Sequence, residues 1–441
     1  MKKSLYLLLG LVLVLFLAAC SGDDGTEETS TDNGAEESSD NSGSEETSGE
    51  DVTLRIAWWG EQTRHDYTLE VIEMYEEQNP NVTIEPEYAS WDDYWQKLAP
   101  QAAANELPDI IAMDLSYLSQ YAQNGQLADL EPFLENEIDI SNISEDNVYA
   151  GQVNDGLYGF NLGVNALGFQ YNPEKLAEIG YDEIPEDWTW DKFQEMSQAA
   201  ADAGIYFDNG FQADVFFNYY LRTQGKRLYA EDGSGLGYED DQLFVDFFSM
   251  VTEEVEKGAT PTPDFLAQLA GPEDDPVIKG EGVGIFQWSN QFVGLEQLSG
   301  LDFEFAPMPG PNMEEGLFLK PSMFFSVAEN SEAKAEAAKF ISFFINDIEA
   351  NKLILGDRGV PISSEVLEAL KSEVSDSQAQ VFDYIEWAEQ NSTPMGAADP
   401  AGAGEIIELL TSLSEQMSYG ETTPEEAAEY FRTQAESILG N

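Results

Sequence analysis

Apolar positions along the chain change their spacing at short intervals, and these changes predict short strands alternating with helices. Residues 52–59 read Val-Thr-Leu-Arg-Ile-Ala-Trp-Trp, a run that alternates at its start and meets Gly60, as a strand followed by a loop would. The next segment is predicted to be a helix that ends at Asn79-Pro80. Its apolar residues with helical spacing are Leu69, Val71, Ile72 and Tyr75.

The alternation continues with predicted strands over 82–85 and 109–113, a helix over 91–105 and a helix from about residue 116 to residue 125. This order predicts an α/β fold in which a mostly parallel sheet carries helices on both faces. Ligands of such sheets bind at the carboxyl ends of the strands. The candidate binding residues at or just beyond those ends are Trp58, Trp59, Glu61, Arg64, Trp91 and Asp114.

Later segments predict further elements of the same kinds. Residues 157–173 indicate a hairpin that leads into a long strand, and a helix is expected to begin within 188–191. Residues 282–286 predict a strand that ends near Trp288. A strongly amphipathic helix is predicted from the apolar stripe Ala333, Ala337, Phe340, Ile341 and Phe344.

The N-terminus has the parts of an export signal. Lys2 and Lys3 precede an apolar run over 7–19, which is shorter than the about 20 residues that a membrane-spanning helix needs. The run ends in Leu17-Ala18-Ala19-Cys20, which resembles a bacterial lipobox, and Cys20 is the only cysteine of the chain. We therefore predict a lipoprotein signal peptide over 1–20 and acyl chains such as palmitate on Cys20. The alternative is an ordinary signal peptide with a cysteine at its edge.

The segment after the signal is predicted to be a disordered tether. Apart from Ala35, its only aliphatic side chain, the segment 21–51 consists of Gly, Ser, Thr, Asn and acidic residues. Such a segment buries too little apolar surface to offset the entropy of ordering it. Like charges extend it. We expect it to hold a globular body of two lobes away from a membrane.

The composition excludes several classes of protein. A formal net charge of −66 argues against binding to nucleic acid or anionic lipid, so partners are expected to be neutral or cationic. With one histidine, His65, and no cysteine in the body, zinc sites and nucleophilic triads are not expected. Gly225-Lys226 is followed by Arg227 and lacks the glycine spacing of a phosphate loop, and we expect no cofactor.

The acidic residues are spread along the whole chain, which we interpret as adaptation to a saline environment. The alternative interpretation is an acidic patch that binds a cation.

A set of weak motifs, in order along the chain, resembles the family 1 extracellular solute-binding proteins. These are the maltodextrin-binding-protein-like receptors of ABC sugar importers. The motifs are the lipobox, the acidic tether, Trp58-Trp59-Gly60, Asn79-Pro80, Pro108-Asp109-Ile110, Tyr171-Asn172-Pro173, Trp188-Thr189-Trp190, Gly280-Glu281-Gly282-Val283-Gly284 and Arg358-Gly359-Val360-Pro361. The resemblance covers nearly the whole mature chain. Within the family, Trp58-Trp59-Gly60 and Arg64-His65 are most similar to receptors for plant-wall oligosaccharides such as pectin-derived ones.

The resemblance implies a two-lobed, type II periplasmic-binding-protein-like fold that closes on a sugar at a hinge. Each lobe is expected to hold a mostly parallel sheet flanked by helices. The first lobe would combine 52–162 with 327–357, and the second 163–326 with 358–441. The implied crossovers lie near residues 162–166, 321–327 and 358–361. The implied protein is a monomeric receptor on the extracellular face of the cell membrane, held there by its lipid anchor alone. It would deliver its ligand to the transmembrane subunits of a permease.

A sugar presents apolar C–H faces ringed by hydroxyl groups, so its receptor needs aromatic platforms and polar side chains at the rim. Glu61 and Asp114 would accept hydrogen bonds, and Arg64 and Arg358 could donate to hydroxyls or to a uronate. Aromatic candidates are Trp58, Trp59, Trp91 and Trp288, with Phe217 and Tyr219 from the second lobe. Asn165 and Asn290 join them by position alone.

Each candidate has a structural alternative. The aromatic residues could be core packing, and Asp114 could simply cap the helix after it. Arg64 could pair with surrounding acids, and Arg358 could stabilise a helix C-terminus. We expect His65 to lie at the surface or behind the binding residues.

Two other functions compete with an oligosaccharide receptor. A receptor for a cationic or compatible solute is suggested by the acid excess together with aromatic residues, which can form a cage around quaternary ammonium ions. A secreted glycoside hydrolase with paired carboxylates is the other, but no acid/base pair stands out. The sequence therefore predicts a binding protein and not an enzyme.

Overall fold

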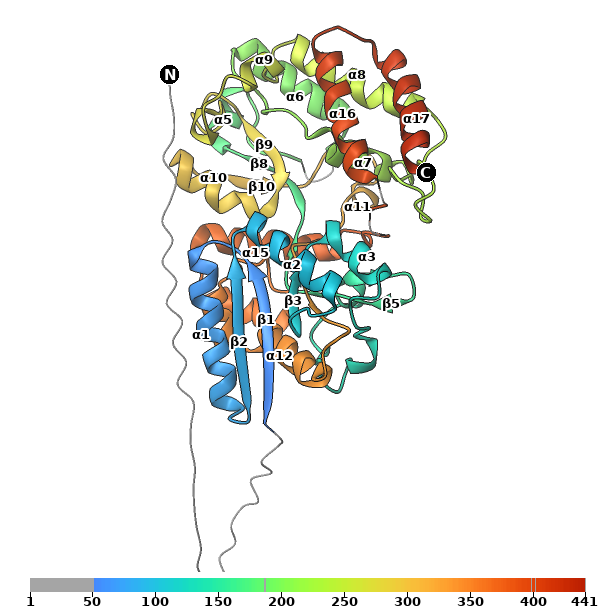
Figure 1. Cartoon of the computed structure of the whole chain (residues 1–441). Coiled ribbons are helices and arrows are strands. Elements are labelled where there is room, and N and C mark those ends of the chain that lie inside the picture. Colours follow the sequence, from blue (N-terminus) through green and yellow to red (C-terminus); the bar gives the residue numbers. More distant parts are fainter. Residues whose placement is uncertain (1–50, 186–187, 398, 401, 441) are drawn as a thin grey trace, which may run out of the picture. The chain divides into compact units, whose positions relative to one another are not determined.

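The computed structural model describes residues 51–185, 188–397, 399–400 and 402–440 (Figure 1). The predicted signal peptide, Cys20 and the predicted tether up to residue 50 lie outside the described residues. The strands are β1 Val52–Trp59, β2 Val82–Ala89, β3 Ile110–Met113, β4 Gln152–Val153, β5 Gly156–Leu157, β6 Phe160–Asn161, β7 Val164–Asn165, β8 Leu167–Tyr171, β9 Gly284–Trp288, β10 Glu304–Ala306, β11 Lys320–Pro321 and β12 Phe324–Val327.

The helices cover both the predicted segments and several others. They are α1 Gln62–Gln78, α2 Trp91–Ala104, α3 Leu115–Gln123, α4 Glu145–Val148, α5 Pro173–Glu178, α6 Trp190–Ala203, α7 Ala213–Thr223, α8 Gln242–Glu256, α9 Pro263–Leu266, α10 Phe292–Ser299, α11 Met313–Gly316, α12 Lys334–Asn346, α13 Ile348–Ile354, α14 Ser364–Leu370, α15 Asp376–Gln390, α16 Ala403–Ser418 and α17 Pro424–Leu439. Within the described part of the chain, none of them is long and apolar enough to span a membrane.

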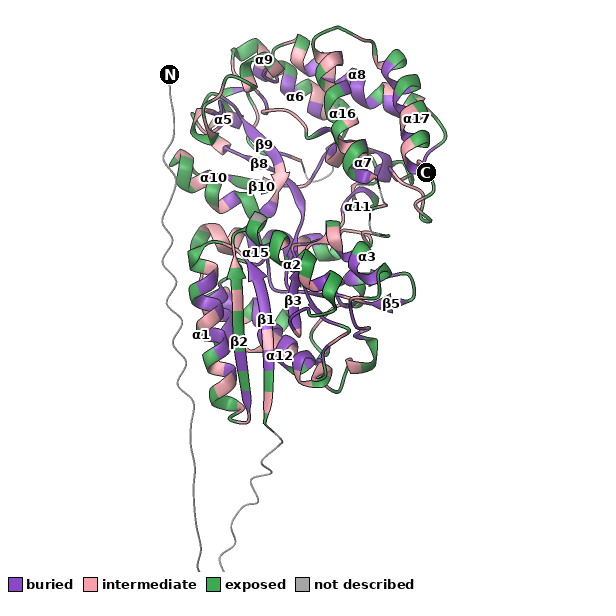
Figure 2. Cartoon of the chain, in the orientation of Figure 1, coloured by how far each residue is buried: buried purple, intermediate pink, exposed green. Residues whose placement is uncertain are grey.

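The first sheet has five strands in the order β2-β1-β3-β12-β6. Its strands β2, β1 and β3 run parallel, as the strand-helix alternation predicts, while β12 is antiparallel to β3. Buried residues are concentrated in β1 and β3 (Figure 2). In α12, the predicted apolar stripe is buried at Ala337, Phe340, Ile341 and Phe344.

The edge of the first sheet shows why a proline is tolerated within a strand. β2 continues past the predicted end at residue 85 to Ala89 and includes Pro86. Because β2 is an edge strand, a missing N–H on its outer side breaks no ladder bond. Glu76 accepts a hydrogen bond from the outward N–H of Ile84 at 2.6 Å, so this edge offers few free donors to another chain.

The second sheet corrects a prediction. Its order is β10-β8-β9, and both outer strands are antiparallel to β8, so it is not mostly parallel. Parallel pairing beside it is limited to the bridge between Tyr206 and Gly282. Every residue of β8 is buried, as in a strand covered on both faces. Such an apolar run is compatible with either strand direction, so the pattern alone could not fix it.

The predicted hairpin over 157–173 is also wrong. The segment contains four short strands with different partners: β5 pairs with β4, β6 with β12, β7 with β11, and β8 with β9 and β10. The chain therefore leaves the first sheet at β6 and enters the second at β8. Strand pairing between distant segments, and not a local turn, decides this path.

Three distant segments meet at β7. Val164 exchanges backbone hydrogen bonds with Val360 at 2.9 and 3.0 Å, and pairs with Pro321 of β11. Gly163 is required here, since a Cβ atom at this position would lie 2.4 Å from the carbonyl oxygen of Arg358. The resemblance placed crossovers near all three segments.

Two predicted boundaries differ from the strands and helices observed. β12 begins at Phe324 and pairs with β3, so residues 324–326 lie in the first sheet. α14 lies within the range predicted for the second lobe but packs against α13, and Asn142 donates to Glu365 of α14 at 2.9 Å. The remaining assignment of segments to lobes stays a prediction.

Candidate functional site

An aromatic cluster lies where β1 and β3 of the first sheet end. We define the first aromatic cluster as Trp59, Trp91, Tyr94, Trp95 and Tyr117. Trp59 ends β1 and is 7 % exposed, while Trp91 opens α2 and is 40 % exposed. Their ring centroids are 4.9 Å apart in an edge-to-face contact, so buried Trp59 supports the exposed ring of Trp91.

The cluster continues from Trp95 to the helix after β3. Trp95 stacks on Tyr117 with ring centroids 3.9 Å apart. The Nε1 atom of Trp95 is buried and has no hydrogen-bond partner among the described residues. A buried N–H without an acceptor is costly, so Trp95 Nε1 is an unsatisfied donor within the cluster.

Two carboxylates follow the same strand ends. Asp114 caps α3: its Oδ1 accepts from the backbone N–H of Ser116 at 2.9 Å and from the Ser116 hydroxyl at 2.5 Å. The capping role and a ligand contact are compatible, since neither bond uses Oδ2. Glu61 precedes α1, is exposed, and makes no side-chain capping bond.

Trp58 does not reach the surface, and its prediction as a platform is corrected. It is 0 % exposed because successive side chains of a strand point to opposite faces, and its face is covered by α1. Its Nε1 donates to Nδ1 of His65 at 3.1 Å, and Tyr88 lies against both rings. His65 is buried beside Trp58, not at the surface; burial, followed by the Arg64 charge, lowers its pKa.

Both predicted arginines have protein partners. Arg64 donates through Nε to Oδ2 of Asp357 at 2.8 Å and through Nη2 to the Asp357 carbonyl at 3.1 Å. Tyr67 donates to the same carboxylate oxygen at 2.7 Å. The structural alternative for Arg64, pairing with an acid, is therefore observed.

Arg358 is corrected from a ligand contact to a buried structural cation. It is 1 % exposed and donates to Oγ1 of Thr68 at 2.8 Å. Its guanidinium lies 5.2 to 5.6 Å from the ring centroids of Tyr67, Phe325 and Phe344, which enclose it. Burial lowers the pKa of Arg358. Because the side chain is enclosed, it presents no surface that a ligand could contact.

Trp288 is the predicted residue that the second sheet presents best. It ends β9, is half-buried, and carries the ammonium of Lys320 at 4.9 Å from its ring centroid. Phe318 packs edge-to-face against it at 5.9 Å. Arg222 lies 4.7 Å from the Phe318 ring and binds backbone carbonyls of residues 393–395. Cations and aromatic rings thus alternate along this surface.

Phe217 and Tyr219 are corrected, because both are 0 % exposed in the interior around α7. Phe217 packs among the phenylalanine side chains of α8, and Tyr219 donates its hydroxyl to the Pro309 carbonyl at 3.0 Å. Their helix has an apolar face that points into the core, which the sequence periodicity could have revealed.

The two predicted asparagines differ. Asn290 is exposed in a 3-10 helix over Ser289–Gln291. Asn165 of β7 is 8 % exposed, lies opposite Lys320 of β11, and has a buried Oδ1 without a partner in the described part of the chain. Asn165 and Trp288 are therefore both linked to Lys320.

Lys320 and Asp214 are site residues that sequence reasoning missed. Asp214 lies in the first turn of α7, and its buried Oδ1 has no partner among the described residues. Burial raises the pKa of Asp214, and the charge of Lys320 opposes this rise. No local motif marks either residue: the pairing of β11 with β7 brings Lys320 to Asn165, and the charge of Lys320 acts on Asp214 of α7. Trp95 had a signal, since it follows Trp91 at helical spacing.

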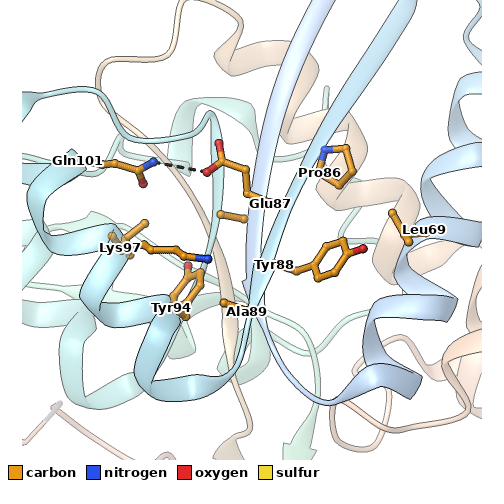
Figure 3. A pocket seen from close by; sticks show the side chains of 10 residues that line it. Leu69, Pro86, Glu87, Tyr88, Ala89, Tyr94, Lys97 and Gln101 are labelled. Atoms are coloured by element: carbon orange, nitrogen blue, oxygen red, sulfur yellow. Dashed lines mark hydrogen bonds between the residues drawn. The ribbon is translucent and has the colours of Figure 1, made fainter. Parts of the chain in front are cut away.

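A pocket of about 510 Å³ lies along the outer edge of β2 and shares Tyr94 with the first aromatic cluster (Figure 3). Leu69 of α1 and Tyr88 lie on one side of the strand; Tyr94, Lys97 and Gln101 of α2 lie on the other. Gln101 donates to Glu87 at 3.4 Å. None of the predicted site residues lines this pocket, and the blocked edge of β2 makes it a poor strand-docking site.

No group of three or more His, Cys, Asp or Glu side chains within the described ranges could hold a metal ion. The side chains of the first aromatic cluster, and those around Trp288 and Lys320, can form hydrogen bonds and stacking contacts.

Comparisons with known proteins identify the family and the fold of the chain. The sequence profile of the bacterial extracellular solute-binding proteins matches residues 70–383. An uncharacterized lipoprotein of Streptomyces antibioticus is 24% identical over 376 residues, which cover 78% of this chain and 81% of that protein.

Solved structures show the same two-lobed fold. A family 1 extracellular solute-binding protein of Alicyclobacillus acidocaldarius superposes with a TM-score of 0.78 at 27% identity, covering 89% of this chain and 100% of the other. A periplasmic oligogalacturonide-binding protein of Yersinia enterocolitica, in complex with saturated digalacturonic acid, gives a TM-score of 0.70 at 25% identity, covering 88% and 98%. The predicted type II fold and family resemblance are confirmed.

Proposed function

Because this chain belongs to the bacterial extracellular solute-binding proteins, we propose that it is the substrate-binding lipoprotein of an ABC importer. It binds an oligosaccharide by hinge closure and delivers it to the permease. The observation that carries the ligand class is the exposed Trp91 ring, which lies 6.3 Å from the ring of Tyr117 in α3, the helix that Asp114 caps.

The chemistry of these side chains suits a sugar. Trp91 offers an apolar face, held in position by Trp59 and Trp95. Asp114 can accept a hydroxyl hydrogen bond, and Trp95 Nε1 can donate one. Trp288 at the end of β9 and Asn165 of β7 offer a second ring together with an amide oxygen that has no partner among the described residues. A sugar has apolar faces and hydroxyl groups that match both kinds of partner.

Anchoring rests on the sequence. Leu17-Ala18-Ala19-Cys20 supports processing to a lipidated N-terminus, and the similar Streptomyces antibioticus protein is described as a lipoprotein. A single acyl chain binds a membrane only reversibly, so two or more chains would hold the protein at the extracellular face. The acidic residues 21–51 would then let the receptor reach both ligand and permease. We propose that the receptor is a monomer.

Isothermal titration against a panel of oligosaccharides tests the ligand class. We expect saturable binding that Trp91→Ala and Trp288→Ala weaken by at least about tenfold, as loss of a stacking contact would. Tyr430→Ala is the matched control, because Tyr430 is an exposed aromatic residue of α17 outside both surfaces. Absence of heat and of thermal stabilisation across the panel would refute an oligosaccharide receptor.

The panel also includes choline and betaine, and its sugars are assayed for new reducing ends. Binding of quaternary ammonium ions alone would favour a receptor for a cationic or compatible solute. Turnover would favour a glycoside hydrolase.

A further inference from the structure

The charge of the ligand can be inferred from the side chains that remain free to meet it. A uronic sugar carries a carboxylate and requires an available cation, whereas a neutral sugar requires hydrogen-bond acceptors for its hydroxyl groups. Each cation near the candidate residues can therefore be examined for its existing partners.

The two predicted arginines are already in use. Asp357 neutralises Arg64 at 2.8 Å, and the enclosed guanidinium of Arg358 is 1 % exposed. Neither is free to form the bidentate pair that makes arginine effective in carboxylate binding.

Lys320 is the remaining cation beside a predicted platform. Its ammonium lies 4.9 Å from the Trp288 ring centroid and makes no ion pair within the described ranges. Burial raises the pKa of Asp214 and of Asp399, and the charge of Lys320 opposes both rises, so this ammonium already interacts with two acidic groups. Arg222, the other cation on this side, is 3 % exposed and donates to backbone carbonyls of residues 393–395, so it is not free to bind an anionic ligand.

The polar atoms that have no hydrogen-bond partner also favour a neutral ligand. Oδ1 of Asn165 and Oδ1 of Asp214 are buried without hydrogen-bond partners among the described residues. Asn165 is more than nine-tenths buried, so its free oxygen is not compensated by bulk water. Both atoms are acceptors, so their partner must donate. The hydroxyl groups of either a neutral or a uronic sugar can donate to these atoms, but the carboxylate of a uronic sugar cannot, and beside Asp214 it would meet a like charge.

We propose that the ligand is a neutral oligosaccharide, bound around Lys320 through hydroxyl donors to Asn165 of β7 and Asp214 of α7, with carboxylate-bearing sugars disfavoured. This inference rests on the proposed function and deepens it. It separates the chain from the Yersinia enterocolitica neighbour, whose structure holds digalacturonic acid. A quaternary ammonium group fits less well, because its N-methyl groups carry no N–H or O–H donor for these oxygens.

Matched sugar pairs provide the test. Oligogalacturonides and the corresponding α-1,4-linked galactose oligomers differ only in whether C6 is a carboxylate or a hydroxymethyl group. Glucuronoxylan fragments and unbranched xylo-oligosaccharides form a second pair. Cello- and malto-oligosaccharides extend the neutral set. Titrations of the full chain should give at least about tenfold tighter binding for the neutral class, a difference of about 1.4 kcal/mol.

Two variants separate charge from shape. Asp214→Asn keeps the oxygen and removes the negative charge. It should increase the affinity for the uronic sugar of each pair and so reduce the difference in affinity between the neutral and the uronic sugar. Lys320→Met removes the ammonium that lies over the Trp288 ring, so any binding of the uronic sugar that depends on this charge should be lost in the variant. Circular dichroism and the melting temperature verify that both variants fold. In a separate titration of the wild type, the affinity for the neutral sugar should change little with added salt.

The outcomes distinguish the two proposals. Tighter binding of the uronic class, lost in Lys320→Met, would overturn the neutral-ligand inference while the oligosaccharide receptor stands. Absence of binding to either class would overturn both.

Discussion

Trp58 donates its indole N–H to Nδ1 of His65 across 3.1 Å, joining the end of β1 to the first turns of α1. The ring of His65 also lies 4.3 Å from that of Tyr88. Nδ1 can accept this hydrogen bond only while it carries no proton. The contact therefore makes the neutral form of the one histidine part of the folded structure.

We predict that His65 makes the protein less stable in mild acid. Its lowered pKa, caused mainly by burial, means that the unfolded chain takes up a proton first as pH falls. The contribution is fully present above the unfolded pKa and is lost as pH falls below about 6.5. Urea unfolding near pH 7.5 and near pH 5 should show a larger loss of unfolding free energy for the wild type than for His65→Gln. Equal losses would contradict this role.

Asp208 is predicted to act in the opposite direction. Burial is the main cause that raises its pKa to about 7, and Thr260 and Gly210 donate to its Oδ1 at 2.8 Å. Stability from the protonated form is fully present below the unfolded pKa of about 4 and is lost as pH rises to about 7, at up to roughly 1.4 kcal/mol per pH unit. Asp208→Asn should therefore be more stable than wild type near pH 8, measured by urea unfolding. Asp146→Asn, at an exposed position, should follow the wild-type profile.

Arg358 is predicted to contribute to stability and not to ligand affinity. Arg358→Ala leaves a cavity among the rings of Tyr67, Phe325 and Phe344 and should destabilise the protein by about 2–4 kcal/mol. Arg358→Met fills more of the space and should cost less. Thermal unfolding and titration measure the two effects separately. A Met variant with unchanged melting temperature but abolished ligand binding would show that Arg358 contacts the ligand.

Gly163 is predicted to be intolerant of a side chain. A Cβ atom there would lie 2.4 Å from the Arg358 carbonyl oxygen, so Gly163→Ala forces backbone movement and should cost about 1–3 kcal/mol. Gly294→Ala is the matched control, because its Cβ would meet open space in α10 and alanine favours a helix by up to about 1 kcal/mol. Similar unfolding free energies for the two variants would contradict a close crossing at β7.

Salt is predicted to stabilise the protein. With 85 acidic residues against 19 basic ones, repulsion among carboxylates opposes the compact state, and ions screen it. The melting temperature should rise between about 0.1 M and about 1 M NaCl. A falling melting temperature would reject adaptation to a saline environment.

Local patterns predicted the first sheet well because its strands and helices alternate along the chain. The range of β1 follows directly from residues 52–59, and the apolar stripe of α12 is buried as predicted. The antiparallel second sheet was missed, since the buried run of β8 has no feature that reports the direction of its neighbours. The short strands over 157–173 were missed because each pairs with a distant segment.

The candidate site shows the same division. Aromatic and acidic residues at strand ends marked Trp91, Asp114 and Trp288, which the structure leaves accessible or half-buried. The sequence could not separate Trp58 from Trp59, because both rings are buried and only tertiary packing sets Trp58 against His65 and Trp59 against the exposed ring of Trp91.

By itself, the sequence predicted an export signal and an acidic tether, and it indicated the family and the strand-helix order of the first sheet, because these depend on local composition and periodicity. Only the tertiary structure decided which cations are free. Arg64 meets Asp357, aromatic rings enclose Arg358, and β11 brings Lys320 to Trp288 and Asn165. These contacts join residues far apart in the chain, and burial, strand pairing and charge neutralisation between such residues leave no local pattern.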